Sequence, residues 1–212
     1  MRWPGGLEIL RMNSEPIFRW LFIAIFVAMF SISVAFRRKA RQSGEVIPRA
    51  REGAGRLLLR FVFAAPLYLG ILAYMLNPAW MAWSSLAVPA WVRWLGAALG
   101  LAMVPMVYWV MRSLGTNVSE TVLTKPHHRL VSHGPYRWVR HPLYTVATTA
   151  FFSLGLLAAN AFLLAVAVLA LAAIALLVIP AEEKELLRKF GDDYRRYMQQ
   201  TGRLWPRLGR LG

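Results

Sequence analysis

Five long apolar segments, none containing Asp or Glu, constrain the fold of this chain more than any other feature. They are residues 16–36, 57–76, 89–111, 142–158 and 161–179. A helix needs roughly 20 mainly apolar residues to cross the hydrocarbon core of a bilayer, and each segment comes near that length. With 58% hydrophobic and 17% charged residues, the composition also fits a membrane protein better than a soluble domain. We therefore expect an all-α, polytopic membrane bundle of five transmembrane helices.

The positive charge is concentrated in three parts of the chain and predicts its orientation. The formal net charge is +15, and most Lys and Arg residues lie between the first two apolar segments, between the third and fourth, and after the fifth. Only Arg2, Arg11, Arg19 and Arg93 fall on the other side. The positive-inside rule then places the amino terminus outside and the carboxyl terminus in the cytoplasm, as in a bacterial-type inner membrane. This distribution favours membrane lipids, and not nucleic acid, as partners.

The connections between the apolar segments predict two further features. Trp80, Trp83, Trp91 and Trp94 occupy a linker with almost no charge, which is typical of residues in the opposite headgroup region. Residues 158–161 form the only break between the last two segments, so these should pair as a tight helical hairpin.

The segment after the hairpin should form one amphipathic helix on the cytoplasmic side. Pro180 is expected to end the fifth span and to open this helix. Apolar and aromatic residues then recur at helical spacing: Leu186, Leu187, Phe190, Tyr194, Tyr197 and Met198. We interpret residues 186–198 as a membrane-surface helix with no part in the chemistry.

The chain has no cysteine, which excludes disulfides, thiolate nucleophiles and cysteine-ligated metal centres. All four histidines, His127, His128, His133 and His141, fall in one short loop region. Their spacing does not form a helical metal-binding pair, and Glu120 is the only neighbouring carboxylate. We therefore predict no metal site.

The polar block at residues 134–144 and the acidic pair after the hairpin are the candidate site. Pro142 suits the first turn of a helix, so the fourth span should begin there with free amides and a positive dipole end that favour an anion. Tyr136, Arg140, His141 and Tyr144 surround this helix start, and Glu182 and Glu183 leave the hairpin at the same level. S-adenosylmethionine carries a carboxylate, an amine, an aromatic base and a positive sulfur, and would suit such a site.

At these residues the chain resembles the isoprenylcysteine carboxyl methyltransferase family and, more distantly, the phospholipid methyltransferases. The resemblance covers roughly residues 114–206. It rests on His128-Arg129-Leu130-Val131, Gly134-Pro135-Tyr136, Arg140-His141-Pro142-Leu143-Tyr144, Glu182-Glu183, Phe190-Gly191-Asp192-Asp193-Tyr194 and Thr201-Gly202-Arg203. Each motif is weak alone, but six in this order at fitting spacing are strong.

The resemblance implies a membrane methyltransferase that uses S-adenosylmethionine and a lipophilic or lipidated acceptor. By motif, the implied cofactor contacts are His128, Arg129, Leu130, Val131, Tyr136, His141, Pro142, Leu143, Tyr144 and Glu182. It also divides the chain into residues 1–113, with three spans and a basic loop, and residues 114–212, with the cofactor loop, the hairpin and the carboxyl-terminal helix.

One departure leaves the acceptor open. Prenylcysteine enzymes of the family carry an Arg about one turn before the acidic pair, where it holds the acceptor carboxylate, and this chain has Val178. Arg137 or Arg140 could replace that anchor, with Arg140 and Glu183 as the catalytic candidates. A carboxylate acceptor needs no base, whereas an amine or hydroxyl would need Glu183 or His141 to take its proton.

Three other functions compete with this one. The chain could be a phospholipid or amine N-methyltransferase, which differs only in the acceptor. It could be a nicotinamide-dependent membrane reductase, because sterol reductases have a distantly similar carboxyl-terminal bundle. It could also be a non-enzymatic protein whose basic loops bind anionic lipid.

Overall fold

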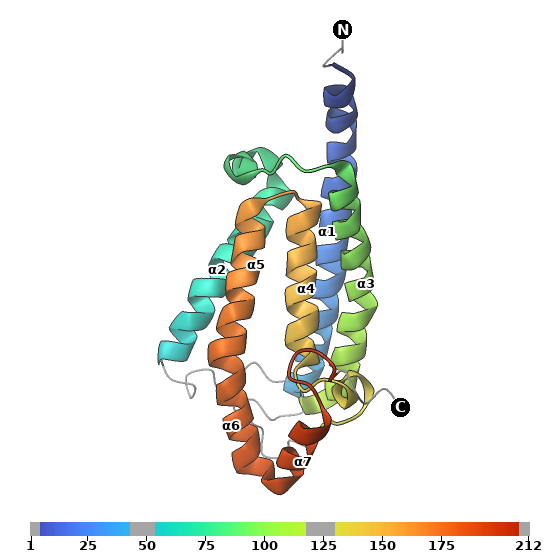
Figure 1. Ribbon diagram of the computed structural model, residues 1–212. Helices are drawn as coiled ribbons and strands as arrows, with labels where there is room; N and C mark the ends of the chain where they lie inside the picture. The colour runs from blue at the N-terminus through green and yellow to red at the C-terminus, as the bar shows by residue number, and fades with distance from the viewer. Residues whose placement is uncertain (1–4, 43–53, 118–129, 208–212) are drawn as a thin grey trace.

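The computed structural model describes residues 5–42, 54–117 and 130–207, and over these residues the protein is an all-helical bundle (Figure 1). The long helices are α1 (Gly5–Gln42), α2 (Ala54–Leu76), α3 (Ala90–Leu114), α4 (Pro142–Leu157) and α5 (Ala161–Ala173). Short 3-10 turns η2 (Pro78–Ser84), η3 (Gly115–Asn117) and η4 (Gly134–Arg137) lie between them. All five predicted apolar segments are therefore helical.

Three helical stretches are long and apolar enough to cross a membrane, namely Glu15–Gln42, Ala90–Leu114 and Ala161–Phe190. Phe61–Leu76 and Pro142–Leu157 are apolar but shorter. The protein is thus a helical membrane protein, while the count of five spans and the orientation stay predictions. The division of the chain at residues 113 and 114 also stays a prediction.

The core lies where α1, α3 and α4 pack side by side, with α4 against α3 over most of its length (Figure 1). Its largest fully buried side chains include Phe18, Phe22 and Ile25 of α1, Met111 of α3, and Leu154 and Leu157 of α4. Helix α5 runs beside α4 on one face and α2 on the other. This packing holds the start of α4, where the candidate site lies, on a rigid base.

The turn between α4 and α5 is fixed by Asn160, which is 2% exposed. Its Oδ1 accepts a hydrogen bond from the Leu163 amide at 3.1 Å and so caps α5. Its Nδ2 donates to the Met81 carbonyl at 3.1 Å and to Ser84 Oγ at 2.8 Å. One side chain therefore joins the α4–α5 connection to η2.

Pro180 lies in the first turn of the next helix, as predicted, but the prediction that it ends the fifth helical segment is wrong. The segment continues from α5 through a π-turn (η5, Ile174–Val178) into α6 (Ile179–Phe190). In the π-turn the Ile179 amide donates to the Ile174 carbonyl, five residues back. A proline lacks the amide that an α-helix would use, and this wider turn just before Pro180 accommodates it without ending the helix.

The predicted single amphipathic helix is instead two helices, α6 and α7 (Asp192–Gln200). They meet at Gly191, whose φ of +53° is a conformation that side chains disfavour. The chain turns back there, so α7 lies beneath the loop that precedes α4 (Figure 1). This return brings the carboxyl-terminal residues to the candidate site.

Candidate functional site

The start of α4 and the first turn of α6 meet in a cluster of ionisable side chains, which we call the His141–Glu183 cluster. His141 Nε2 lies 3.3 Å from Glu183 Oε1, and its Nδ1 lies 3.8 Å from Glu182 Oε2. The Tyr144 hydroxyl donates to Glu182 Oε2 at 2.9 Å. His141 is buried, whereas the Glu182 side chain is 29% exposed. The cluster thus joins residues that are some forty positions apart, as the sequence predicted.

Arg140 is held by the protein through its Nε and Nη1 groups. Its Nε donates to Glu183 Oε1 at 2.9 Å, and its Nη1 donates to the carbonyls of Met198 at 3.1 Å and Thr201 at 2.6 Å. Its side chain is 9% exposed. These bonds hold the guanidinium against Glu183 and the carboxyl-terminal segment, so Arg140 is poorly placed to anchor an acceptor carboxylate.

A backbone connection holds the carboxyl-terminal segment against the loop before α4. The Arg140 amide donates to the Gly202 carbonyl at 2.8 Å, and the Gly202 amide donates to the Trp138 carbonyl at 3.0 Å. The His141 amide donates to the Arg203 carbonyl at 3.1 Å. A Cβ at position 202 would overlap the Trp205 carbonyl, so this turn requires glycine.

Helix α7 packs into the site, which corrects the interpretation of residues 186–198 as a membrane-surface helix. Tyr194 and Tyr197 are 1% and 7% exposed. The Tyr197 hydroxyl donates to the Tyr136 carbonyl at 2.6 Å. Burial raises the pKa of Tyr136, Tyr194 and Tyr197, so all three phenols stay protonated at neutral pH. The helically spaced Tyr194 and Tyr197 therefore face the loop before α4, and not the membrane.

The start of α4 offers fewer free amides than the sequence predicted. Pro142 has no amide, and the amides of Tyr144 and Thr145 donate to the His141 carbonyl at 3.2 Å and 3.3 Å. The His141 amide is bound to the carboxyl-terminal segment. An anion near this helix start would therefore depend mainly on side chains, because most first-turn amides are already paired.

Two buried donors in the cluster have no hydrogen-bond partner within the described part of the chain. They are Arg203 Nε and the Tyr194 hydroxyl. Arg203 contacts Glu183 through Nη2, at 3.4 Å from Oε2, and its side chain is 40% exposed. A guanidinium with a buried, unpaired N–H favours an anionic acceptor such as a carboxylate. Neither residue was predicted for the site, although Arg203 ends the Thr-Gly-Arg motif.

A largely apolar cavity of about 380 Å³ adjoins the cluster. Helices α1 to α4 line it, and Leu143 and Tyr144 belong to both the cavity and the candidate cofactor site. Arg37 of α1 is the one cationic side chain among its lining residues. Arg37 was not predicted as a site residue, because it belongs to a dense basic stretch of the sequence in which nothing distinguishes it.

The remaining predicted residues have no recorded contact with this cluster or lie outside the described chain. Leu130 and Val131 are partly buried, and Val131 packs against the core. Arg137 is exposed, with its guanidinium 4.0 Å above the Trp138 ring. His128 and Arg129 lie outside the described residues. Among residues 15–42, 54–117 and 130–207, no group of three or more His, Asp or Glu side chains could hold a metal ion.

Residues 94–188, which include α4, Glu182 and Glu183, match the model of the isoprenylcysteine carboxyl methyltransferase (ICMT) family. The region is of the ICMT type. This confirms the family resemblance, but with other bounds than the predicted 114–206: the match begins in α3 and ends at residue 188, before the motifs at residues 190–194 and 201–203. The match and the fold together support an integral membrane methyltransferase.

Two relatives match parts of this chain. "Uncharacterized protein YpbQ" of Bacillus subtilis (strain 168) is 28% identical over 130 residues, which cover 60% of this chain and 71% of the relative. The methanethiol S-methyltransferase of Mycobacterium tuberculosis (strain ATCC 25618 / H37Rv) is 35% identical over 75 residues. That second match covers 35% of this chain and only 30% of the relative.

The bundle also resembles a solved structure, that of the eukaryotic intramembrane Ras methyltransferase ICMT. The TM-score is 0.53, and the match covers 88% of this chain and 67% of the other at 21% identity. At this identity the likeness shows the ICMT fold. It extends well beyond residues 94–188 and so includes amino-terminal helices for which the sequence offered no motif.

Proposed function

We propose that this protein is an integral membrane methyltransferase that uses S-adenosylmethionine and methylates a lipophilic acceptor at the cytoplasmic face of the membrane. The observation that carries the proposal is that Tyr144 belongs to both the ionisable cluster and the apolar cavity. Its hydroxyl binds Glu182 in the ionisable cluster, and the same residue lines the apolar cavity between α1 and α4. A polar cofactor and an apolar acceptor would meet at this residue.

The donor set fits S-adenosylmethionine. The unpaired Arg203 Nε suits the cofactor's carboxylate. The partly exposed Glu182 suits its amine or a ribose hydroxyl. His141 and Tyr144, whose rings stack with centroids 5.9 Å apart, offer aromatic surface. Tyr136, Pro142, Leu143, Leu130 and Val131 complete the proposed contacts, with His128 and Arg129 added by motif.

When bound, the cofactor supplies an electrophilic methyl group on a positive sulfur. The protein's residues position the reactants. Holding the reacting atoms near contact distance can lower the activation free energy by roughly 7 to 11 kcal/mol. Arg140 and Glu183 act as positioning residues, because their mutual bond ties α4 to α6. Tyr144 orients Glu182, and the apolar cavity wall excludes water from the acceptor side.

Glu183 is a poor candidate for a general base in this geometry. One of its oxygens accepts from Arg140 and lies beside His141, and the other lies 3.4 Å from Arg203. A carboxylate held by two guanidinium groups has little tendency to take a proton. For a thiol, amine or hydroxyl acceptor, Glu182 or His141 is the better base.

The acceptor is proposed to occupy the cavity of about 380 Å³, with Arg37 as its polar anchor. An apolar chain with an acidic end would match this lining. Arg37 would bind the acidic end, which Val178 cannot do. The methanethiol relative adds a thiol to the acceptors that merit testing. A phospholipid or amine acceptor is the alternative that keeps the same cofactor site.

Binding of S-adenosylmethionine to the purified protein in detergent, measured by calorimetry, tests the cofactor assignment. We expect saturable binding to the wild type and a loss of affinity of at least tenfold in Glu182→Gln. Asp193→Asn, which changes an exposed carboxylate of α7, is the matched control and should bind normally. Binding of reduced nicotinamide cofactor in place of S-adenosylmethionine would overturn the proposal.

A further inference from the structure

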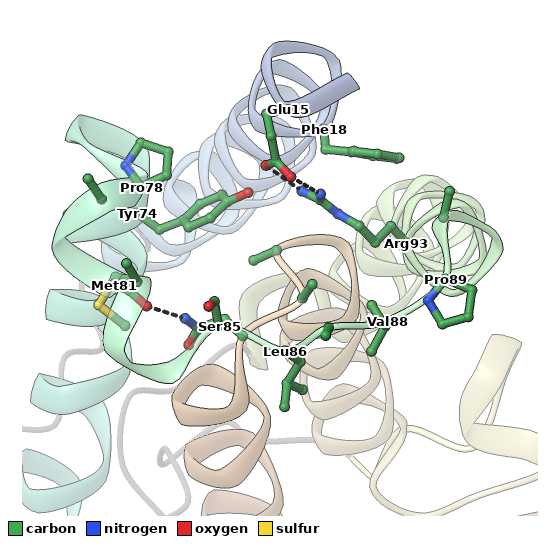
Figure 2. Close-up of a pocket in the computed structure, with 17 residues that line it drawn as sticks. Glu15, Phe18, Tyr74, Pro78, Met81, Ser85, Leu86, Val88, Pro89 and Arg93 are labelled. Carbon is green, nitrogen blue, oxygen red and sulfur yellow. Dashed lines mark hydrogen bonds and ion pairs between the residues drawn. The ribbon is translucent and has the colours of Figure 1, made fainter. Parts of the chain in front are cut away.

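A second cavity, of about 680 Å³, lies at the opposite end of the bundle from the His141–Glu183 cluster. Figure 2 shows its walls, which come from the ends of α1, α2 and α3, the connection from Pro78 to Pro89, and the α4–α5 turn. Its volume falls within the roughly 300–1,000 Å³ of typical ligand pockets. Most of its lining is apolar, and Glu15, Tyr74 and Arg93 form a polar group at one side, while Ser85 lies elsewhere in the lining (Figure 2).

The polar side holds a buried arginine. Arg93 is 6% exposed; its Nε donates to the Leu157 carbonyl at 3.0 Å, and Nη1 and Nη2 both donate to the Glu15 carboxylate, Nη2 to Oε2 at 3.1 Å. The guanidinium also lies 4.0 Å above the Phe18 ring. These bonds use three of its five N–H groups. The Glu15 side chain, in contrast, is 45% exposed and accessible from the cavity.

Tyr74 completes this polar side. It is 3% exposed, and its hydroxyl points toward the Glu15–Arg93 pair (Figure 2). The hydroxyl makes no well-formed hydrogen bond with any described residue. Arg93, the nearest polar neighbour of this hydroxyl, can only donate, so the hydroxyl proton is left for an acceptor from outside the described residues.

The aromatic residues at this end of the bundle predict that the cavity lies at the level of the lipid headgroups. Four exposed tryptophans surround this end of the bundle: Trp80 at 60%, Trp83 at 72%, Trp91 at 66% and Trp94 at 50% exposed. Tryptophans gather where the hydrocarbon core meets the headgroups. A ligand entering from this level would present an apolar body and a polar head together.

The charges of the cavity select among lipid headgroups. Glu15 and Arg93 together carry no net charge but offer both signs within one ion pair. An anionic headgroup would be attracted by Arg93 and repelled by Glu15, whereas a zwitterionic headgroup satisfies both. A primary amine can also donate hydrogen bonds to Glu15, which a trimethylated amine cannot.

We propose that this cavity binds the headgroup of a zwitterionic phospholipid with a primary amine, of the phosphatidylethanolamine type. The phosphate accepts hydrogen bonds from the Tyr74 hydroxyl and Arg93, and the amine donates to Glu15. The site is independent of the proposed methyl transfer, because it lies at the other end of the bundle.

The test uses the full-length protein in a neutral detergent and measures lipid affinity from the shift in thermal unfolding during titration. Short-chain phosphatidylethanolamine should bind at least tenfold more tightly than phosphatidylcholine or phosphatidylglycerol. Tyr74→Phe, which removes only the hydroxyl, should weaken phosphatidylethanolamine binding about tenfold. Tyr108→Phe, at a 45% exposed tyrosine outside the cavity, is the matched control and should not.

Glu15→Gln provides a second variant in case Tyr74→Phe is unstable, with helical circular dichroism as the check on folding. It should abolish the preference for phosphatidylethanolamine over phosphatidylcholine. Equal affinity for the three lipids, or unchanged binding by folded Tyr74→Phe, would overturn the proposal and leave water as the partner of Tyr74. Equally tight binding of soluble phosphoethanolamine would overturn the assignment to a lipid.

Discussion

The two ends of the bundle each contain a buried arginine paired with a glutamate, but the two pairs differ in how far they are closed. At the His141–Glu183 cluster both side chains of the Arg140–Glu183 pair are about one-tenth exposed, at 9% and 11%. At the opposite end the Arg93 side chain is 7% exposed and the Glu15 side chain is 45% exposed. A closed pair serves as a scaffold for its neighbours, whereas a half-open pair keeps one partner available to a ligand.

The largest effect is expected from Arg140→Ala, because it breaks the closed pair. It leaves the buried Glu183 carboxylate and the Met198 and Thr201 carbonyls with fewer donors. Removing one partner of a buried pair typically lowers the free energy of unfolding by about 3–5 kcal/mol. Denaturant unfolding in detergent, followed by circular dichroism, measures the change.

Arg196→Ala is the control for that experiment, because Arg196 is 68% exposed and pairs with Asp193 on the surface of α7. The free energy of unfolding should change by less than about 0.5 kcal/mol. Equal effects of Arg140→Ala and Arg196→Ala would contradict the distinction between a scaffold pair and a surface pair.

Arg93→Met should have a smaller effect on the free energy of unfolding, about 1–3 kcal/mol, because Glu15 can be rehydrated when its partner is lost. S-adenosylmethionine affinity, measured by calorimetry, should stay within about twofold of wild type, since the pair lies at the other end of the bundle. A large loss of cofactor affinity in folded Arg93→Met would show that the two ends are coupled.

Tyr144→Phe should weaken S-adenosylmethionine binding about tenfold, equal to about 1.4 kcal/mol, because the hydroxyl orients Glu182. The exposed Tyr108→Phe again serves as control. Unchanged affinity in the Tyr144 variant would remove Tyr144 from the cofactor site, even if the protein remained an active methyltransferase.

Arg37→Gln is expected to have the smallest effect, on the acceptor alone. Its loss should raise the KM for a prenylated cysteine with a free carboxylate about three- to tenfold while leaving kcat unchanged, as for a residue that contributes uniform binding. A labelled-methyl assay measures both constants. A fall in kcat with unchanged KM would contradict an anchoring role.

Helix positions were predictable from the sequence where hydrophobic length and local chemistry agree. Pro142 marks the observed start of α4, and Asn160 caps α5 at the predicted break. The continuation of the helix past Pro180 was not predictable, because a π-turn next to a proline leaves no separate signal in an apolar sequence. Gly191 was part of a recognised motif, but its positive φ could not be inferred from spacing alone.

The candidate site was predictable in its motif residues and not in its tertiary partners. The short turn at Asn160 joins α4 to the continuous α5–α6 segment, and the two run side by side. This brings together His141, Tyr144, Glu182 and Glu183. The burial of Tyr194 beside them depends on the chain reversing at Gly191. The Glu15–Arg93–Tyr74 group joins three helices that share no motif, so only the folded structure reveals it.

Photochemical cross-linking of labelled S-adenosylmethionine to the detergent-purified protein, followed by peptide mapping, tests most directly which end of the bundle binds the cofactor. We predict saturable labelling in peptides that contain Tyr136 to Tyr144 or Glu182 to Arg203, and competition by S-adenosylhomocysteine. Competed labelling confined to peptides from Tyr74 to Arg93, or no competed labelling of folded protein, would contradict the assignment of the His141–Glu183 cluster as the cofactor site.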